Sequence, residues 1–137
     1  MENTFTGSLQ SKTEALAAFL QTASAFLESH GLPARLVNAV KLVLEETLMN
    51  TIRYGYDNTG LHTIEVRIAV KSDEIHLCIE DDGRPFNPLT VPRQDRRKPA
   101  IDRAEDGLGI HLVRHIMRAM AYRREQEKNV FDIWIDR

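Results

Sequence analysis

The amino-acid sequence predicts an α+β fold in which helices cover one face of a largely antiparallel sheet. Two segments, residues 12–30 and 33–54, carry apolar residues at helical spacing, and a third helix is expected after residue 109. Residues 63–70 and 75–79 alternate apolar and polar side chains, as half-buried strands do. Helices and strands of this kind pack as two layers around one core.

The N-terminal segment has the pattern of a short strand followed by an amphipathic helix. Residues 3–9 are expected to form an edge strand. Ser11 and Glu14 have the spacing of a capping box, in which the Ser11 hydroxyl bonds the Glu14 amide and the Glu14 carboxylate reaches back to Ser11. Apolar residues then recur at helical spacing until Gly31, which is expected to end the helix.

The second helix is expected to begin near Pro33 and to end at Gly55. Turn-forming residues 57–60 separate it from the strand at residues 63–70. A second turn at residues 71–74 leads into the next strand, so an antiparallel hairpin is expected.

The chain between residues 84 and 106 has no periodic pattern and contains several prolines and basic residues. A stretch of this length without an element is usually a functional lid or a disordered segment. A helix is expected from residue 110 to about residue 120. Two strands follow at residues 121–127 and 130–135, with residues 128 and 129 as the turn between them.

Composition limits the classes of function. The 137 residues suit one domain with a substantial core, and a single domain over residues 1–137 is expected. A net charge of −2 gives no electrostatic footprint for direct nucleic-acid or anionic membrane binding. The sequence contains no apolar run near the ~20 residues of a membrane-spanning helix and begins without a secretory signal pattern. The single cysteine, Cys78, excludes an internal disulfide, and we expect a cytoplasmic protein.

Glu46 and Asn50 lie four residues apart and share one face of the second helix. A solvated helix face is the common explanation of such a pair. Asn is a mediocre helix former, so its place deep in a long helix suggests a task, such as offering its carbonyl oxygen to a hard cation. Mg²⁺ takes one or two protein oxygens, with phosphate oxygens and waters completing its octahedron. Glu46 would then be the acid that polarises a hydroxyl.

Asp81 and Gly83 follow the second strand of the hairpin, where turn chemistry is the simpler explanation. A carboxylate fixed at a strand end also matches the exocyclic amine of adenine, and Gly83 would let the backbone pass close to a planar base. Gly107, Leu108 and Gly109 open the third helix, either as a flexible junction or as a turn whose amides hold a polyphosphate.

Together these motifs resemble the N, G1 and G2 boxes of the GHKL ATPases. Glu46 and Asn50 match the Glu-x-x-x-Asn of the N box, residues 81–83 match the Asp-x-Gly of G1, and residues 107–109 match the Gly-x-Gly of G2. The resemblance covers about residues 10–136 and is strongest to the small anti-sigma-factor serine kinases.

This resemblance implies a two-layer α/β sandwich of the Bergerat type, with a mostly antiparallel mixed sheet, three helices on one face and a mobile ATP lid at about residues 84–106. It implies that Asn50 coordinates Mg²⁺, that Glu46 is the general base for a serine hydroxyl, and that Asp81 contacts adenine. The other ATP-binding positions that it implies are Arg53, Gly83, Arg103, Gly107, Leu108 and Gly109.

The resemblance also implies partners. These are a sigma factor and an anti-anti-sigma protein of the STAS type that receives the phosphoryl group, and a homodimer is a further implication. Two positions depart from close relatives, because Tyr54 stands where His is common and Asp106 where Gly is common. Two functions therefore stay open: a serine kinase that sequesters a sigma factor, and a nucleotide-gated binding regulator with little or no kinase activity. A detached sensor-kinase domain is disfavoured, because there is no room for a phosphoacceptor hairpin before the helix that carries Glu46.

Overall fold

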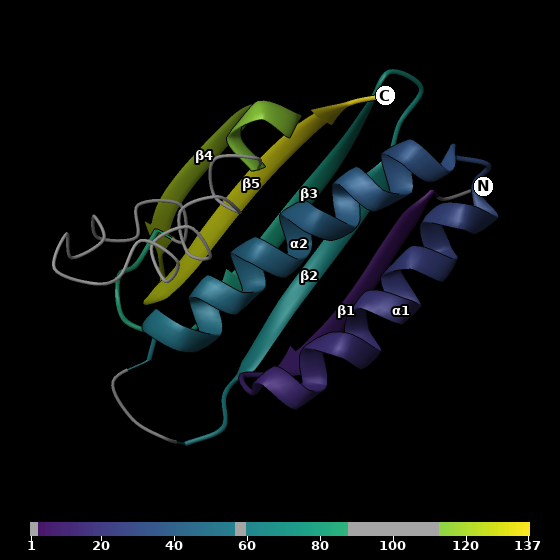
Figure 1. Ribbon diagram of the computed structural model, residues 1–137. Helices are drawn as coiled ribbons and strands as arrows, with labels where there is room; N and C mark the ends of the chain where they lie inside the picture. The colour runs from purple at the N-terminus through teal and green to yellow at the C-terminus, as the bar shows by residue number, and fades with distance from the viewer. Residues whose placement is uncertain (1–2, 57–59, 88–112) are drawn as a thin grey trace, which may run out of the picture.

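The computed structural model describes residues 3–56, 60–87 and 113–137. In chain order the elements are β1 (Thr4–Gln10), α1 (Thr13–Ser29), α2 (Ala34–Tyr54), β2 (Thr63–Val70), β3 (Glu74–Asp81), β4 (Met117–Glu125) and β5 (Lys128–Asp136). The strands form one sheet in the order β1-β2-β3-β5-β4. Figure 1 shows α1 and α2 side by side on one face of this sheet, and residues 113–116 form a further helical segment.

The predicted α+β fold is confirmed. All four pairs of neighbouring strands are antiparallel, so the described strands contain no parallel pair of the expected mixed sheet. The predicted antiparallel hairpin of β2 and β3 is confirmed, and its register pairs Glu65 with Glu80 and Val70 with Ile75. β1 is an edge strand, also as predicted.

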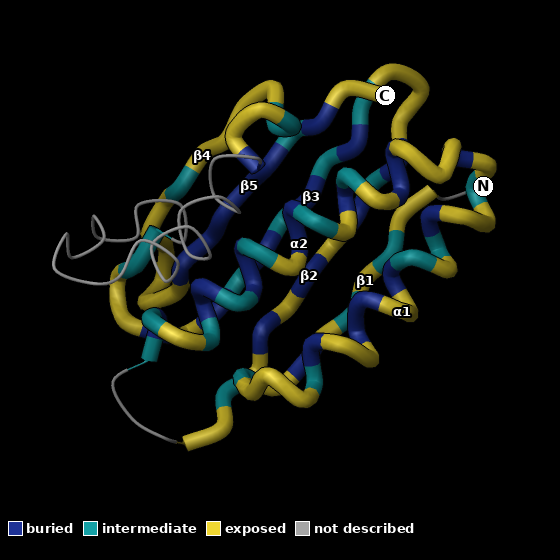
Figure 2. The backbone as a smooth tube through the Cα atoms, in the orientation of Figure 1, coloured by how far each residue is buried: buried dark blue, intermediate teal, exposed yellow. Residues whose placement is uncertain are grey.

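The core lies between the helices and the sheet, where the dark segments of Figure 2 meet. Alternate side chains of the central strands point into it, as do the apolar stripes of both helices. Fully buried members from these elements include Leu27, Val40, Leu44, Leu48, Ile64, Ile68, Leu77 and Ile133. Burial of each such side chain contributes about 1.5–3 kcal/mol, so this layer fixes α2 against the strands that end at the candidate site.

The predicted capping box at Ser11 is wrong. α1 begins at Thr13, and its N-cap, Lys12, makes no side-chain capping bond. Ser11 instead pairs with His62: its amide donates to the His62 carbonyl at 2.8 Å, and the His62 amide donates to Ser11 Oγ at 2.9 Å. The antiparallel β1–β2 ladder brings the two residues together, so a non-local partner has replaced the local cap.

Both predicted helix ends are confirmed. Gly31 has φ of 73°, a left-handed conformation that favours glycine, directly after α1. Gly55 follows α2 and donates its amide to the Thr51 carbonyl at 2.9 Å.

The C-terminal elements begin earlier than predicted. β4 starts at Met117 although helix was expected to about residue 120, because pairing with β5 overrides the helical spacing of Met117 and Met120. The turn between the strands lies at Gln126 and Glu127, with φ of 52° and 63°, where a two-residue hairpin turn is expected to have positive φ. The predicted turn at residues 128 and 129 is therefore wrong, and Asn129 belongs to β5.

Candidate functional site

Asn50 is a buried polar residue in the last turns of α2. It is 7% exposed, and it lies among residues whose polar groups are also buried. Thr47 Oγ1 donates to the Val43 carbonyl at 2.7 Å, and Thr51 Oγ1 donates to the Thr47 carbonyl at 3.0 Å. A solvated helix face therefore does not describe Asn50, because burial of an amide is unfavourable unless it has partners.

The two charged residues near Asn50 differ in exposure. Glu46 is half-buried and Arg53 is exposed. The spacing of Glu46 and Asn50 predicted a shared helix face, but their roles as a base and a cation ligand stay predictions.

Asp81 ends β3 with a buried carboxylate that is held by neutral donors. The residue is 5% exposed. Asp81 Oδ1 accepts the Gly83 amide at 2.9 Å and Asn129 Nδ2 at 3.0 Å. Burial raises the pKa of Asp81 above its ordinary value, and the hydrogen bonds from Asn129 and Gly83 oppose part of that rise. The carboxylate is thus costly in the fold, as expected of a group kept for a ligand.

The backbone at Gly83 lies against the end of α2. A Cβ at position 83 would collide with the carbonyl oxygen of Gly55. The adjoining Arg84 amide donates to that same oxygen at 2.9 Å. The close approach of Gly83 to a base stays a prediction, and the described residues show a close approach of its backbone to Gly55.

The Arg84 side chain adds a second contact between the segment after Asp81 and the end of α2. Its Nε and Nη2 donate to the Tyr54 carbonyl at 2.9 and 2.6 Å, so the guanidinium caps the free carbonyl end of α2. The Tyr54 ring also lies 6.2 Å from that of Phe86. The helix of Asn50 and the segment after Asp81 are therefore joined directly.

Tyr56 brings an unsatisfied hydroxyl to the same region. Its ring stacks on His62 with centroids 4.3 Å apart, and His62 Nδ1 lies 3.4 Å from Asp82 Oδ1. Tyr56 Oη is buried and has no hydrogen-bond partner among the described residues. Burial raises the pKa of the Tyr56 hydroxyl, and the charges of Asp81 and Asp82 raise it further. A polar ligand would supply the missing partner.

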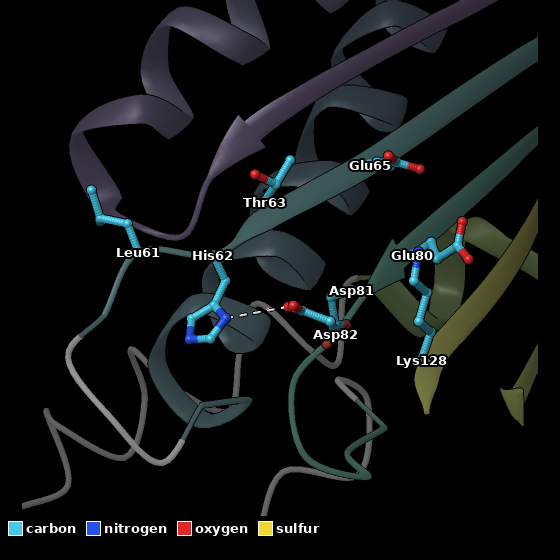
Figure 3. Close-up of a pocket in the computed structure, with 8 residues that line it drawn as sticks. All are labelled: Leu61, His62, Thr63, Glu65, Glu80, Asp81, Asp82 and Lys128. Carbon is cyan, nitrogen blue, oxygen red and sulfur yellow. Dashed lines mark ion pairs between the residues drawn. The ribbon is translucent and has the colours of Figure 1, made fainter. Parts of the chain in front are cut away.

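Figure 3 shows a pocket that is lined by His62, Asp81 and Asp82 together with Leu61, Thr63, Glu65, Glu80 and Lys128. Its volume is about 310 Å³. Thr63, Glu65 and Glu80 alternate with the core residues Ile64 and Ile79, so this part of the pocket lies on the sheet face opposite the helices. Glu65 and Glu80 are also direct cross-strand neighbours. Two facing carboxylates repel a phosphate, so the part of the pocket beside Glu65 and Glu80 does not suit the phosphates of a nucleotide.

The remaining predicted residues lie outside the described part of the chain. These are Arg103, Asp106, Gly107, Leu108 and Gly109, together with the predicted lid from residue 88 onward. The described residues contain no group of three or more His, Cys, Asp or Glu side chains that could hold a metal ion. They also include no helix that is long and apolar enough to cross a membrane.

Sequence reasoning missed Asn129, which is 1% exposed and lies opposite Asp81 in the β3–β5 register. It was assigned to a turn, and no local sequence signal could have revealed it, because Gln126 and Glu127 are not residues typical of a positive-φ turn. Sequence reasoning also missed the cap formed by Arg84 and the contact of Arg124, whose Nη1 donates to the Gly83 carbonyl at 2.7 Å.

Comparison with known proteins identifies the family. The family model described as histidine kinase-like ATPase domain matches residues 9–134. The anti-sigma F factor of Oceanobacillus iheyensis is 26% identical over 91 residues, which cover 65% of this chain and 61% of that protein. The anti-sigma F factor of Bacillus licheniformis is 28% identical over 80 residues, 57% of this chain and 53% of the relative.

A kinase is among the similar proteins. The serine/threonine-protein kinase BtrW of Bordetella bronchiseptica is 26% identical over 96 residues, which cover 70% of this chain and 68% of that protein. The match to the two anti-sigma F factors, by contrast, spans less than two thirds of their length. Because the family model covers most of the sequence, the chain belongs to the histidine kinase-like ATPase domain family.

Proposed function

We propose that this protein binds Mg-ATP and acts in the cytoplasm as an anti-sigma factor with serine-protein kinase activity toward an anti-anti-sigma partner of the STAS type. Family membership supports ATP binding, and the names of the similar proteins support a kinase-like anti-sigma regulator. The observation that carries the proposal is the buried Asn50, on a helix whose end is hydrogen-bonded to the segment following the buried Asp81.

The described residues fit a magnesium nucleotide. Asn50 offers an amide oxygen to Mg²⁺, with phosphate oxygens and water as the other ligands. The Asp81 carboxylate matches the amino group of adenine, and the Tyr56 hydroxyl lacks a partner. In this proposal the phosphate-facing residues are Arg53, Arg103, Gly107, Leu108 and Gly109, while Gly83 shapes the wall of the base pocket.

Glu46 is the proposed general base. ATP supplies the phosphoryl group, whose bond to the ADP oxygen breaks as a bond to the serine oxygen forms. Glu46 accepts the proton that the serine hydroxyl loses, and ADP leaves. The phosphorylated partner gains close to two negative charges, which would prevent it from docking and from displacing the sigma factor.

Phosphoryl transfer to a purified anti-anti-sigma protein tests this role. Glu46→Gln is expected to lose at least about 100-fold in transfer rate while keeping its affinity for ADP. Glu45→Gln is the matched control, because Glu45 is the exposed neighbour on the same helix. No transfer by the wild type, or full-rate transfer by Glu46→Gln, contradicts the kinase proposal.

The alternative is a nucleotide-gated binding regulator with little or no kinase activity. It is favoured by the two departures from close relatives, Tyr54 and Asp106. The Tyr54 ring lies 6.2 Å from the Phe86 ring, so a different side chain at position 54 alters a contact between the end of α2 and the segment after Asp81. Partner affinity that depends on nucleotide and is unchanged in Glu46→Gln would support this reading. Equal partner affinity with ATP, ADP and no nucleotide would exclude it.

We also propose a homodimer formed through the free edge of β1. None of its seven residues is charged, so two copies can pair antiparallel without facing like charges. β4, at the other edge, carries Arg118, Arg123 and Arg124 and has a register shift near its start. A groove of about 440 Å³ follows β1 and is lined mainly by apolar side chains, among them Phe5, Leu9, Ala15, Ala18 and Phe19.

Light scattering tests this interface. The wild type is expected to be a dimer and Thr6→Lys a monomer, because two lysines would then meet near the symmetry axis. Ala119→Lys places the same charge on the exposed β4 edge and should leave the dimer intact. A wild type that stays monomeric at all concentrations, or a dimer unaffected by Thr6→Lys, contradicts the interface.

A further inference from the structure

Asn129 makes several hydrogen bonds within the described part of the candidate site. Its Nδ2 donates to Asp81 Oδ1 at 3.0 Å and to the Arg84 carbonyl at 2.7 Å. Its Oδ1 accepts the Phe86 amide at 3.2 Å, Arg124 Nη1 at 3.2 Å and the Tyr122 hydroxyl. Both amide hydrogens and the carbonyl oxygen are therefore used, as full burial requires.

These partners come from three parts of the chain. Asp81 ends β3, Arg84 and Phe86 belong to the segment after it, and Tyr122 and Arg124 lie on β4. A side chain that bonds all three holds the carboxylate in one orientation relative to the backbone after it. Arg84 extends the connection to α2, because its guanidinium caps the Tyr54 carbonyl.

Few side chains could replace the amide at this position. An aspartate would put a second carboxylate about 3 Å from Asp81 and would have no hydrogen to donate. A leucine would fill the space but leave the Asp81 oxygen with one donor fewer in a buried place. Only an amide of this length both donates twice and accepts, so the arrangement requires the chemistry of asparagine.

We propose that Asn129 is a positioning residue, which orients the Asp81 carboxylate to accept the exocyclic amino group of an adenine nucleotide. The inference rests on the proposed nucleotide binding. Asn129 itself bonds protein groups and acts on the ligand through Asp81.

The proposal has a consequence for pH dependence. Burial raises the pKa of Asp81, and the Asn129 hydrogen bond is the largest influence that lowers it. Removal of the amide should raise the pKa further, so the carboxylate becomes protonated at a higher pH and accepts the amino group less well. The other groups that act on the pKa of Asp81 are the Gly83 amide and Arg124, which lower it, and Asp82, which raises it. The Asp81 charge in turn raises the pKa of the Tyr56 hydroxyl. His62 Nδ1 lies 3.4 Å from Asp82 Oδ1, and His62 is replaced by Gln in a parallel series.

The test is calorimetric titration of the full chain with ADP and with inosine diphosphate, which lacks the amino group, from pH 5 to pH 8. The wild type is expected to prefer ADP and to lose affinity as the pH falls. Asn129→Leu is expected to bind ADP about ten-fold more weakly at pH 7 and to lose the preference for ADP over inosine diphosphate. The pH at which half of the ADP affinity is lost, called the midpoint below, should shift to a higher value. Asn129→Asp should shift the midpoint in the same direction, which keeps the test valid if the leucine variant does not fold.

Tyr122→Phe is the matched control. It removes a hydroxyl that bonds Asn129 but leaves the donor to Asp81 in place, so the midpoint should stay at the wild-type pH. A merely structural role for Asn129 predicts weaker binding of both nucleotides with an unchanged midpoint, and that result overturns the inference. A wild type that binds neither nucleotide overturns the proposed function as well, so the two failures are distinguishable.

Discussion

Asp81 and Asp132 are buried carboxylates on neighbouring strands, but they face opposite sides of the sheet. Asp81 points to the helix side and has the neutral donors Asn129 and Gly83. Asp132 alternates with core residues of β5, so it points to the open side, where Arg123 Nη1 lies 2.8 Å from Oδ2 and His76 Nε2 lies 2.8 Å from Oδ1. The negative charge of Asp132 is balanced by the adjacent Arg123 guanidinium. The hydrogen-bond donors to Asp81 are neutral groups, so they do not balance its charge.

This difference separates a structural carboxylate from a functional one. A carboxylate with an arginine and an imidazole beside it has its partners already and stabilises the strand pairing around it. A carboxylate with neutral donors keeps acceptor capacity in a place where its charge is unfavourable. The same substitution, Asp→Asn, should therefore have opposite consequences at the two positions.

The largest expected effect is on ligand stabilisation. With ADP at about 100 times its Kd, the wild type should gain about 2.7 kcal/mol of unfolding free energy. Asp81→Asn should lose most of this gain, because an amide presents a donor beside the adenine amino group, while Asp132→Asn should keep it. Thermal unfolding with and without nucleotide measures both, and an equal gain in Asp81→Asn would contradict the adenine site.

The next effect is on intrinsic stability. Asp132→Asn should lower the unfolding free energy by about 1–2 kcal/mol, since it weakens the bonds to Arg123 and His76. Urea unfolding without nucleotide measures this loss. A variant as stable as the wild type would show that Asp132 is not the structural member of the pair.

Asp81→Asn should instead stabilise the free protein at neutral pH. Because the folded-state pKa of Asp81 is raised, its protonated form favours folding, and that stability is lost as the pH rises through the folded-state pKa. The wild type should therefore lose stability relative to Asp81→Asn between about pH 4 and the raised pKa. Urea unfolding over this pH range measures the difference in unfolding free energy between the wild type and Asp81→Asn. A wild type that gains stability relative to the variant as the pH rises would contradict the prediction.

The smallest effect concerns Cys78, which lies beside Asp132. Burial first, and then the charge of Asp132, raise the pKa of the Cys78 thiol to about 11. Asp132→Asn should lower that pKa and speed alkylation by iodoacetamide at pH 8 by about three-fold. Arg67→Gln is the control of opposite sign, because the Arg67 charge lowers the same pKa.

Local patterns predicted most of the fold. The alternation of β2 and β3, the apolar stripes of α1 and α2 and the ends at Gly31 and Gly55 depend on neighbouring residues, and all are confirmed. The failures have non-local causes. Ser11 bonds His62 across the β1–β2 ladder, and Met117 joins β4 through pairing with β5.

The candidate site divides in the same way. The strand-end position of Asp81 agrees with the predicted strand, whereas the burial of Asn50 was not predicted from the motif spacing. Asn129 could not be found from local sequence, because its role depends on a turn position and on the β3–β5 register. The assigned roles of the motif residues stay predictions.

The collision that any side chain at position 83 would make with Gly55 also limits what evolution can reveal there. A relative that had lost nucleotide binding altogether would still be selected for glycine at this position, because the end of α2 leaves no space for a Cβ. An invariant glycine at position 83 is thus explained by the backbone contact with Gly55 alone, and it is poor evidence for an active ATPase. At positions such as Asn129, lack of space for a Cβ does not determine the residue type. The residue types at such positions are therefore better evidence of which family members still bind a nucleotide.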